Sequence, residues 1–245
     1  MNPVVEINHV TKIFPNLRGI HDVSMKVQRG DIYGFFGPNG AGKTTVMKIM
    51  TGLARAQQGE VKLFGFDVST QHEQAMAKVG ALIETAEAYT YMSGRRNLEL
   101  AARLYPGVGK ERVDEVIELV GLTPFQHEKV ARYSLGMKQR LGLAAAILSK
   151  PELLILDEPT NGLDIEGMVH IREIILKLAR EERITFFISS HLIHEMELMC
   201  NRLGIIHHGK LIREGRITDI MAGSPSLEAA YLREIQGNRG LAAHA

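Results

Sequence analysis

The stretch "GPNGAGKTT", residues 37–45, decides the fold class of this chain. It fits the spacing G-x-x-x-x-G-K-[ST] in full, and it lies between a predicted strand, "DIYGFFG", and a predicted helix over Lys43–Met50. Glycines let the backbone wrap closely around phosphate groups, so that consecutive N–H groups point inward. A glycine-rich turn with an incidental lysine is the alternative, but it accounts for neither the spacing nor the strand-to-helix context.

The side chains of this loop predict how phosphates are held. Lys43 can reach the β- and γ-phosphates of a nucleotide, and the Thr44 hydroxyl can bind Mg²⁺. We expect the phosphate-binding residues to be Gly37, Pro38, Asn39, Gly40, Ala41, Gly42, Lys43, Thr44 and Thr45.

Apolar strands alternate with helical segments around this loop. The runs "ELLILDEP" and "ITFFISS" are typical of buried strands, and this alternation predicts a mainly parallel sheet with helices on both faces. The N-terminal runs "VVEINHV" and "HDVSMKV" favour strands, and residues 85–150 show helical periodicity. The predicted fold class is therefore α/β: a P-loop NTPase with a mainly parallel sheet core, an N-terminal antiparallel β subdomain and an inserted α-helical subdomain.

Shorter segments complete the predicted organisation. The run "ARAQQGEVKLFGFD" predicts a turn and an edge strand, "RLGIIHHGKLIREG" a hairpin turning near Gly209, and "SPSLEAAYLREI" a short terminal helix. The last residues, "QGNRGLAAHA", are small and polar and are expected to be frayed. We expect one nucleotide-binding domain over residues 1–220, with its helical subdomain at about 85–150, and a C-terminal helix and flexible tail over 221–245.

Composition limits the classes of protein that the chain can belong to. Of its 245 residues, 45% are apolar and 23% are charged, and the formal net charge is +1, so charge favours neither nucleic acid nor an anionic membrane as a partner. The single cysteine, Cys200, allows no internal disulfide and favours a reducing compartment. We expect no signal peptide, and no apolar run approaches the ~20 residues that cross a bilayer. Any role at a membrane would therefore depend on a partner.

Two adjacent acids follow a buried strand in "LLILDEPT", Leu153–Thr160. In an open α/β sheet the carboxyl ends of the strands face the ligand, so Asp157 is placed to hold Mg²⁺. Glu158 beside it is suited to polarise an attacking water as a general base. A strand-end acid that caps the next turn is the alternative, but it explains two adjacent acids poorly.

One histidine is a candidate for the same site, and two others are not. In "FFISSH", His191 follows another buried strand, where a neutral imidazole could contact the γ-phosphate or the attacking water. Taken alone, such a histidine is more often a cap or a packing residue, and the functional interpretation depends on the neighbouring motifs. His207 and His208 are not expected to form a metal pair, because neighbouring strand residues point to opposite faces.

A second anion-binding helix start is predicted in "YSLGMKQR". Its Ser134-Leu135-Gly136 sequence offers backbone N–H groups and a hydroxyl at the beginning of an apolar helix. Taken with the other motifs, this stretch is similar to the LSGGQ signature of the ATP-binding cassette family, the ATPase subunits of ABC transporters. The resemblance covers about residues 4–215. Ser134 and Gly136 match the signature, while Tyr133, Leu135 and Met137 depart from it, and Leu135 is expected to restrict the backbone where glycine is usual.

The resemblance implies roles for further residues. The signature helix of one subunit would bind the γ-phosphate of ATP held by the P-loop of another, so that two copies enclose two ATP molecules. The run "NGLD", ending at Asp164, resembles the loop that crosses the dimer interface, and Asp164 is assigned to the nucleotide site. Phe14 matches the aromatic position that stacks on adenine; a buried phenylalanine of the first sheet is the alternative. The terminal helix resembles that of exporter-type cassettes.

One departure from the family pattern is informative. Where most members have a glutamine that reaches the Mg²⁺ site, this chain has Glu84, followed by "TAEAYTYMSGRRNLEL". This segment resembles the bacitracin and lantibiotic self-protection exporters. Tyr89 and Tyr91 would then form the wall of a groove that contacts the membrane subunit, the alternative being ordinary packing inside the helical subdomain.

The expected function is that of a dimeric ATPase subunit that binds ATP and Mg²⁺. Glu158 and His191 would be its catalytic residues, and Thr44, Asp157 and Glu84 would hold the Mg²⁺. It would act at the cytoplasmic face of the cell membrane and drive export by a separate membrane permease, without a nucleic-acid partner. The alternatives are a cassette ATPase acting in DNA repair or translation, and a degenerate cassette that only binds ATP. No long heptad run separates Lys43 from Ser134, which counts against the first alternative, and the presence of Glu158 and His191 counts against the second.

Overall fold

The computed structural model of the chain describes residues 3–84 and 87–242, with side chains up to residue 236. The chain forms two compact units. The first contains the two ends of the chain, Met1–Met76 and Thr185–Ala245, and the second is the intervening segment, Ala77–Ile184. The second unit therefore includes more than the helical subdomain expected at residues 85–150, and the domain boundaries of the sequence analysis stay a prediction.

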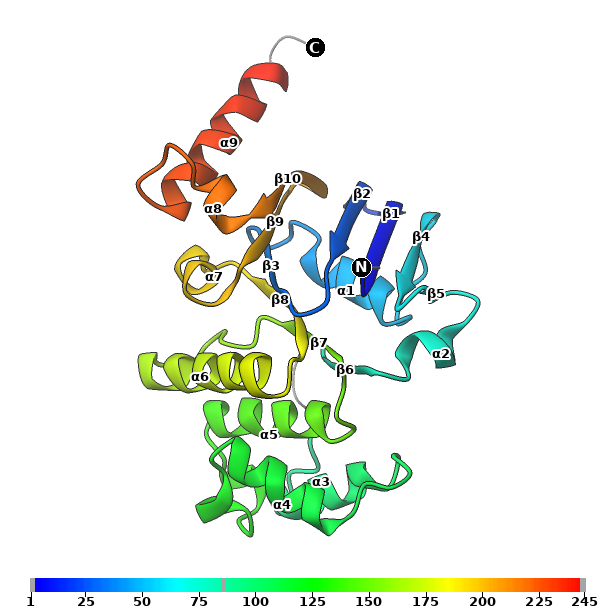
Figure 1. The fold of residues 1–245 in the computed structure, drawn as a ribbon, viewed down its shortest axis with the longest axis vertical. Coiled ribbons are helices and arrows are strands. Elements are labelled where there is room, and N and C mark those ends of the chain that lie inside the picture. The colour runs from blue at the N-terminus through cyan, green and yellow to red at the C-terminus, as the bar shows by residue number, and fades with distance from the viewer. Residues whose placement is uncertain (1–2, 85–86, 243–245) are drawn as a thin grey trace. The chain divides into compact units, whose positions relative to one another are not determined.

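The N-terminal part of the first unit is an antiparallel sheet, drawn in blue to cyan in Figure 1. The order β2-β1-β4-β5 makes β4 an internal strand and β5 the edge strand, so the run that was expected to form one edge strand forms two strands. The reason is the two-residue turn Phe64-Gly65, whose left-handed backbone (φ 52° and 85°) reverses the chain and adds one more strand. The strands are β1 (Val5–Ile13), β2 (Gly19–Val27), β4 (Gln58–Leu63) and β5 (Phe66–Asp67).

The remaining strands of the first unit are mainly parallel, as the sequence predicted. Strand β3 pairs in parallel with β8 on one side and with β9 on the other, and β9 and β10 form the expected antiparallel hairpin at Gly209. All six residues of β8 are buried, which explains its continuous apolar sequence. The strands are β3 (Ile32–Phe36), β8 (Thr185–Ser190), β9 (Arg202–His207) and β10 (Lys210–Arg216).

Helices α7 and α9 of the first unit contact the parallel strand β3, whereas α1 and α2 contact strands of the antiparallel sheet. A side chain at Gly34 of β3 would come within about 3 Å of Met196 and Cys200, so the glycine allows α7 to lie close to the strand. Phe36 makes an edge-on ring contact with Tyr231 of α9, at a centroid distance of 4.9 Å. The helices are α1 (Lys43–Met50), α2 (His72–Met76), α7 (Ile193–Met199), α8 (Ile217–Ile220) and α9 (Leu227–Ala242).

Two of these helices differ from expectation. Helix α2 was not predicted, because its five residues are too few to show a helical period. Helix α9 continues to Ala242 and includes most of the segment expected to be frayed, since leucine and alanine near its end favour helix despite two glycines.

The second unit joins a parallel strand pair to a group of helices, drawn in green in Figure 1. Helices α3, α4 and α5 contact one another, and α5 also contacts β6. Their buried residues, such as Leu98, Val116 and Leu143, form one apolar core. The elements are β6 (Val79–Leu82), α3 (Gly94–Ala102), α4 (Lys110–Leu119), 3₁₀ turns at Thr123–Phe125 and Val130–Arg132, α5 (Leu135–Ile147), β7 (Leu153–Asp157) and α6 (Ile165–Glu181).

Polar side chains fix where these helices begin and end. Ser93, Ser134 and Asp164 each accept a hydrogen bond from a backbone N–H in the first turn of α3, α5 and α6 respectively. The end of α5 is held by Arg112, whose guanidinium donates to the carbonyl of Ile147 at 2.6 Å. Among the helices of the described residues, none combines the length and the apolar character needed to span a bilayer.

Candidate functional site

The P-loop, which is the stretch "GPNGAGKTT" at residues 37–45, forms a tight turn between β3 and α1. Gly40 and Gly42 have left-handed backbones, with φ of 78° and 109°. The Lys43 ammonium donates to the carbonyls of Gly37 (2.7 Å) and Pro38 (3.2 Å), which holds the lysine across the loop. Thr44 and Thr45 lie in the first turn of α1, whose N-terminal N–H groups favour an anion. A side chain at Gly40 would meet no atom within 4 Å, so that side of the loop is open, and the lysine and the N–H groups are of the kind that suits phosphate.

Neighbouring strands leave no room for side chains at two other P-loop positions. A Cβ atom at Gly37 would lie 2.3 Å from the Ile206 carbonyl oxygen, and one at Gly42 would lie 2.4 Å from Ile20 Cγ2. The Ala41 carbonyl accepts a hydrogen bond from the Gly209 N–H at 3.1 Å. The P-loop is therefore in direct contact with β2, with the end of β9 and with the turn that follows β9.

His191 follows β8, and the start of the P-loop is tied to the same strand end. The Gly37 N–H donates to the Ser190 carbonyl at 3.3 Å. Residue Leu192 is the N-cap of α7, and its N–H donates to the Ser190 hydroxyl at 2.9 Å. His191 is therefore not the cap of α7, and the structure places it beside the phosphate loop.

Phe14 is not a core residue of the first sheet. It lies just beyond β1, in a turn in which its N–H donates to the Arg18 carbonyl and its carbonyl accepts from Leu17. Its side chain is 39% exposed, and the Lys12 ammonium lies 5.6 Å from the ring centre. The alternative of a buried phenylalanine is wrong, and adenine stacking stays a prediction.

Acidic candidates of the second unit follow its two strands. Asp157 is the buried last residue of β7, and Glu158 after it is partly exposed, with a left-handed backbone (φ 49°). Glu84 lies two residues after β6, is exposed, and also has a left-handed backbone (φ 65°). Carboxylates at the carboxyl ends of parallel strands have the hard oxygen ligands that suit Mg²⁺.

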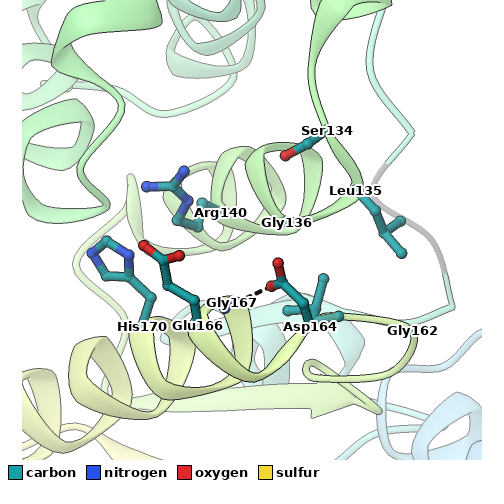
Figure 2. Close-up of a pocket in the computed structure, with 10 residues that line it drawn as sticks. Ser134, Leu135, Gly136, Arg140, Gly162, Asp164, Glu166, Gly167 and His170 are labelled. Carbon is teal, nitrogen blue, oxygen red and sulfur yellow. Dashed lines mark hydrogen bonds between the residues drawn. The ribbon is translucent and has the colours of Figure 1, made fainter.

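The signature residues line a pocket of about 410 Å³ in the second unit (Figure 2). Figure 2 shows the first turns of α5 and α6 at the same end of this pocket. Ser134 Oγ accepts from the Met137 N–H at 3.2 Å, and Asp164 Oδ1 accepts from the Gly167 N–H at 2.9 Å. The structure thus brings together three predicted nucleotide-site residues, Ser134, Gly136 and Asp164.

Leu135 does not strain the signature turn. It is the first residue of α5 and has no positive φ, so the helical backbone there accepts leucine as readily as glycine. Its side chain is half exposed and lies 3.1 Å from a Cβ built at Gly162. The expected loss of backbone freedom therefore has no structural consequence in this conformation.

Three further residues of the pocket were missed in the sequence. Arg140 donates to the carbonyls of Val120 and Gly121, and burial lowers its pKa. Glu166 and His170 stand one turn apart on α6, and Figure 2 shows them beside Arg140. The sequence did contain a signal for these residues. Arg140 comes four positions after Gly136, and His170 comes four positions after Glu166, so the members of each pair lie on one face of a helix.

Tyr89 and Tyr91 are exposed tyrosines of the second unit, and the backbone of Tyr89 is held by the Asn97 side chain. The Asn97 side chain accepts from the Tyr89 N–H at 2.8 Å and donates to the Tyr89 carbonyl at 3.1 Å. Tyr89 and Tyr91 are 52% and 65% exposed, and their rings lie 5.8 Å apart. Ordinary packing inside the subdomain is therefore excluded for both, while contact with a membrane subunit stays a prediction.

Comparisons with known proteins place this site in a family. A family profile described as ABC transporter matches residues 20–161. The chain is 48% identical over 222 residues to the uncharacterized ABC transporter ATP-binding protein YhcH of Bacillus subtilis (strain 168), covering 89% of this chain and 72% of that protein. It is 41% identical over 214 residues to the bacitracin transport ATP-binding protein BcrA of Bacillus licheniformis, covering 87% of this chain and 70% of that protein. A solved structure described as the ATP binding subunit of an ABC transporter has a TM-score of 0.83 at 26% identity, and covers 95% of this chain and 99% of its own.

Proposed function

The chain belongs to the ABC transporter family, and on that premise we propose that it hydrolyses ATP to drive export by a separate membrane permease. The observation that carries this proposal is the geometry of the P-loop, in which Lys43 crosses the loop and α1 begins directly behind it. Backbone N–H groups and a lysine in this arrangement hold the β- and γ-phosphates of a nucleotide.

The catalytic roles follow from the positions of the side chains. When bound, Mg²⁺ neutralises charge on the transferred phosphoryl group. Thr44, Asp157 and Glu84 supply oxygen atoms of the kind that hold it. Glu158 accepts a proton from the attacking water, and His191 contacts the γ-phosphate or that water.

The second anion site is assigned to a partner's nucleotide. Ser134 and Gly136 lie at the beginning of α5, where helix N–H groups and a hydroxyl favour phosphate. Asp164 begins the neighbouring helix on the same pocket. In a dimer of two copies, each pocket closes on the ATP that the other copy holds.

Tyr89 and Tyr91 are the residues proposed to contact the permease. Tyr89 and Tyr91 present aromatic surface next to the segment that follows Glu84, and exposed aromatic groups are favoured at protein interfaces. Because BcrA is named a bacitracin transport protein, a peptide antibiotic is the proposed cargo. The subunit then works at the cytoplasmic side of the membrane through its permease.

Replacing the proposed general base tests the hydrolytic function. Glu158→Gln should bind ATP like the parent and lose about 10²–10⁴-fold in turnover, the usual contribution of a general base. ATPase rates and equilibrium ATP binding are measured on both proteins. Glu118→Gln, which removes an exposed acid on α4, is the matched control and should keep the parent rate. A Glu158→Gln protein that hydrolyses ATP at close to the parent rate would rule out this assignment.

A further inference from the structure

The turn between β9 and β10 contacts neighbouring segments through its backbone. Its two residues, His208 and Gly209, both have left-handed conformations, with φ of 47° and 77°. Such two-residue turns join antiparallel strands tightly, and glycine is favoured in them because it has no side chain to clash. Gly209 is buried although it lies at the tip of a hairpin, where residues are ordinarily exposed.

Gly209 connects two parts of the nucleotide site through its backbone. Its N–H donates to the Ala41 carbonyl of the P-loop at 3.1 Å. Its own carbonyl accepts from the His21 N–H of β2 at 2.8 Å. One residue therefore bridges the phosphate loop and β2.

There is no space for a side chain at this bridge. A Cβ atom at Gly209 would lie 2.2 Å from the Gly19 carbonyl oxygen and 3.2 Å from His21 Cδ2. Gly19 begins β2 and pairs with Ile13, the residue that precedes Phe14. A displacement of Gly19 would therefore be transmitted to Ile13 and to the turn that carries the Phe14 ring.

We propose that Gly209 is a positioning residue that fixes the spacing between the phosphate loop and the base-stacking segment around Phe14. The inference rests on the proposed function, because it takes the P-loop as the triphosphate site and Phe14 as the adenine contact. The bridge sets how well a nucleotide with both a base and phosphates fits. A side chain at Gly209 should affect the phosphate cradle less than the base-stacking segment, since its closest contact would be with Gly19 of β2.

Gly209→Ala tests the proposal directly. Its Cβ pushes Gly19 away, and the affinity for ATP should fall about tenfold, within the range that base–aromatic stacking supplies. Binding of inorganic tripolyphosphate, which uses only the phosphate cradle, should stay close to the parent value. Both are measured by calorimetry without added Mg²⁺, so that turnover does not interfere, and kcat at saturating ATP should also stay close to the parent value.

Gly65→Ala is the matched control within the same unit. The turn Phe64-Gly65 has the same pair of left-handed residues, but a Cβ atom at Gly65 would meet nothing within 4 Å. This variant has the same backbone strain without the clash and should bind ATP like the parent. Equal ATP affinities for Gly209→Ala and Gly65→Ala, or an equal loss of ATP and tripolyphosphate binding in Gly209→Ala, would overturn the proposal.

If Gly209→Ala does not fold, amide hydrogen exchange measured on the unaltered chain provides a second test of the proposal. The amides of Gly209 and His21 should exchange slowly and at similar rates, because each donates within the bridge. Fast exchange of both, as for an exposed hairpin turn, would overturn the inference. If the unaltered chain binds no ATP at all, the proposed function fails instead, which separates the two outcomes.

Discussion

Two acidic residues of the second unit, Glu84 and Glu158, hold their backbones in the left-handed region, at φ 65° and 49°. Each follows a parallel strand, β6 and β7 respectively, and neither is a glycine or an asparagine, for which this conformation is easier. Such backbones cost about 1 kcal/mol or more each and are frequent at functional sites. The structure thus gives Glu84 a feature in common with the proposed general base, which the sequence did not suggest.

Glu84 predicts a stronger dependence on Mg²⁺ than glutamine at the same position. A carboxylate attracts the metal and repels the triphosphate, and each of these terms is roughly 4 kcal/mol at 4 Å with an effective dielectric constant near 20. With Mg²⁺ bound the attraction prevails, and without it the repulsion is uncompensated. Glu84→Gln should therefore lose less nucleotide affinity than the parent when Mg²⁺ is removed. Nucleotide binding and ATPase activity are measured against Mg²⁺ concentration.

The control for this experiment is Glu87→Gln, which removes an exposed charge from the same segment. Its Mg²⁺ dependence should match that of the parent. Parallel curves for the parent and Glu84→Gln would instead mean that the carboxylate does not act at the metal.

The backbone conformation around a candidate site was easiest to predict where one sequence spacing encodes one backbone shape. The P-loop is such a case, because its glycines and its lysine act through local geometry. Leu135 and Phe14 show the limit. Whether a residue is helical or half exposed depends on contacts with distant segments, which a local pattern does not contain.

At the scale of single elements, the segment "SGRRNL" before and within α3 has a structural explanation. A Cβ atom at Gly94 would lie 2.2 Å from the Tyr133 hydroxyl, which itself donates to the Phe125 carbonyl at 2.9 Å. Arg95 pairs with Asp114 of α4 at 2.6 Å, and this hydrogen bond raises the pKa of Arg95. The segment therefore fixes α3 against α4 and the signature loop and positions the exposed tyrosines.

Gly94 and Tyr133 should be coupled in a double-mutant cycle. Gly94→Ala alone should destabilise the chain through the clash, and Tyr133→Phe alone should cost about 1 kcal/mol for its lost hydrogen bond. The double variant should be more stable than the sum of the two effects by about 1 kcal/mol, since removing the hydroxyl removes the closest contact and leaves only the ring carbons at 3.0 and 3.3 Å. The free energy of unfolding in urea provides the measurement.

A second cycle tests whether this coupling is specific. A Cβ atom at Gly107 would have nothing within 4 Å, so Gly107→Ala and Tyr133→Phe should be additive. If the Gly94 cycle is additive as well, the Tyr133 hydroxyl does not clash with a side chain at position 94. The contact between the two residues would then not explain why glycine stands at one position and tyrosine at the other.

Element types and order were largely predictable, including the helix at Lys43–Met50 and the hairpin at Gly209. The length of the terminal helix and the extra strand β5 were not. Both depend on a few residues, a two-residue turn in one case and the last turns of a helix in the other, where local preferences are nearly balanced. The roles of Asn97 and Arg95 could not be read from the sequence either, because their partners are distant along the chain or are backbone groups.

For the whole molecule, the position of Ser134 predicts that catalytic sites are shared between two copies. In a mixture of Lys43→Ala and Ser134→Arg chains, a mixed dimer contains one undamaged composite site and one doubly damaged site. Each variant alone damages both sites. The mixture should therefore trap nucleotide at a level that neither variant reaches by itself. Trapping is preferred to turnover, because strict coupling between sites could abolish hydrolysis.

Loss of a helix cap needs its own control in this experiment. Ser134 caps α5, and losing an N-cap typically costs about 1 kcal/mol. Ser93→Arg removes the equivalent cap of α3 and should trap nucleotide like the parent. A mixture that traps no more than the separate variants would contradict sharing of the sites.

The environment of Cys200 has a practical consequence for observing such dimers. Its Sγ atom lies 3.9 Å from Met196 Sδ, and burial raises the pKa of the thiol well above neutrality. The reactive thiolate is therefore scarce at pH 7, and maleimide dyes should react slowly with the native residue. A cysteine introduced at the exposed position Leu17 would become the preferred attachment point without removal of Cys200. Fluorescence energy transfer between two labelled copies could then follow their association and separation during turnover in an otherwise natural sequence.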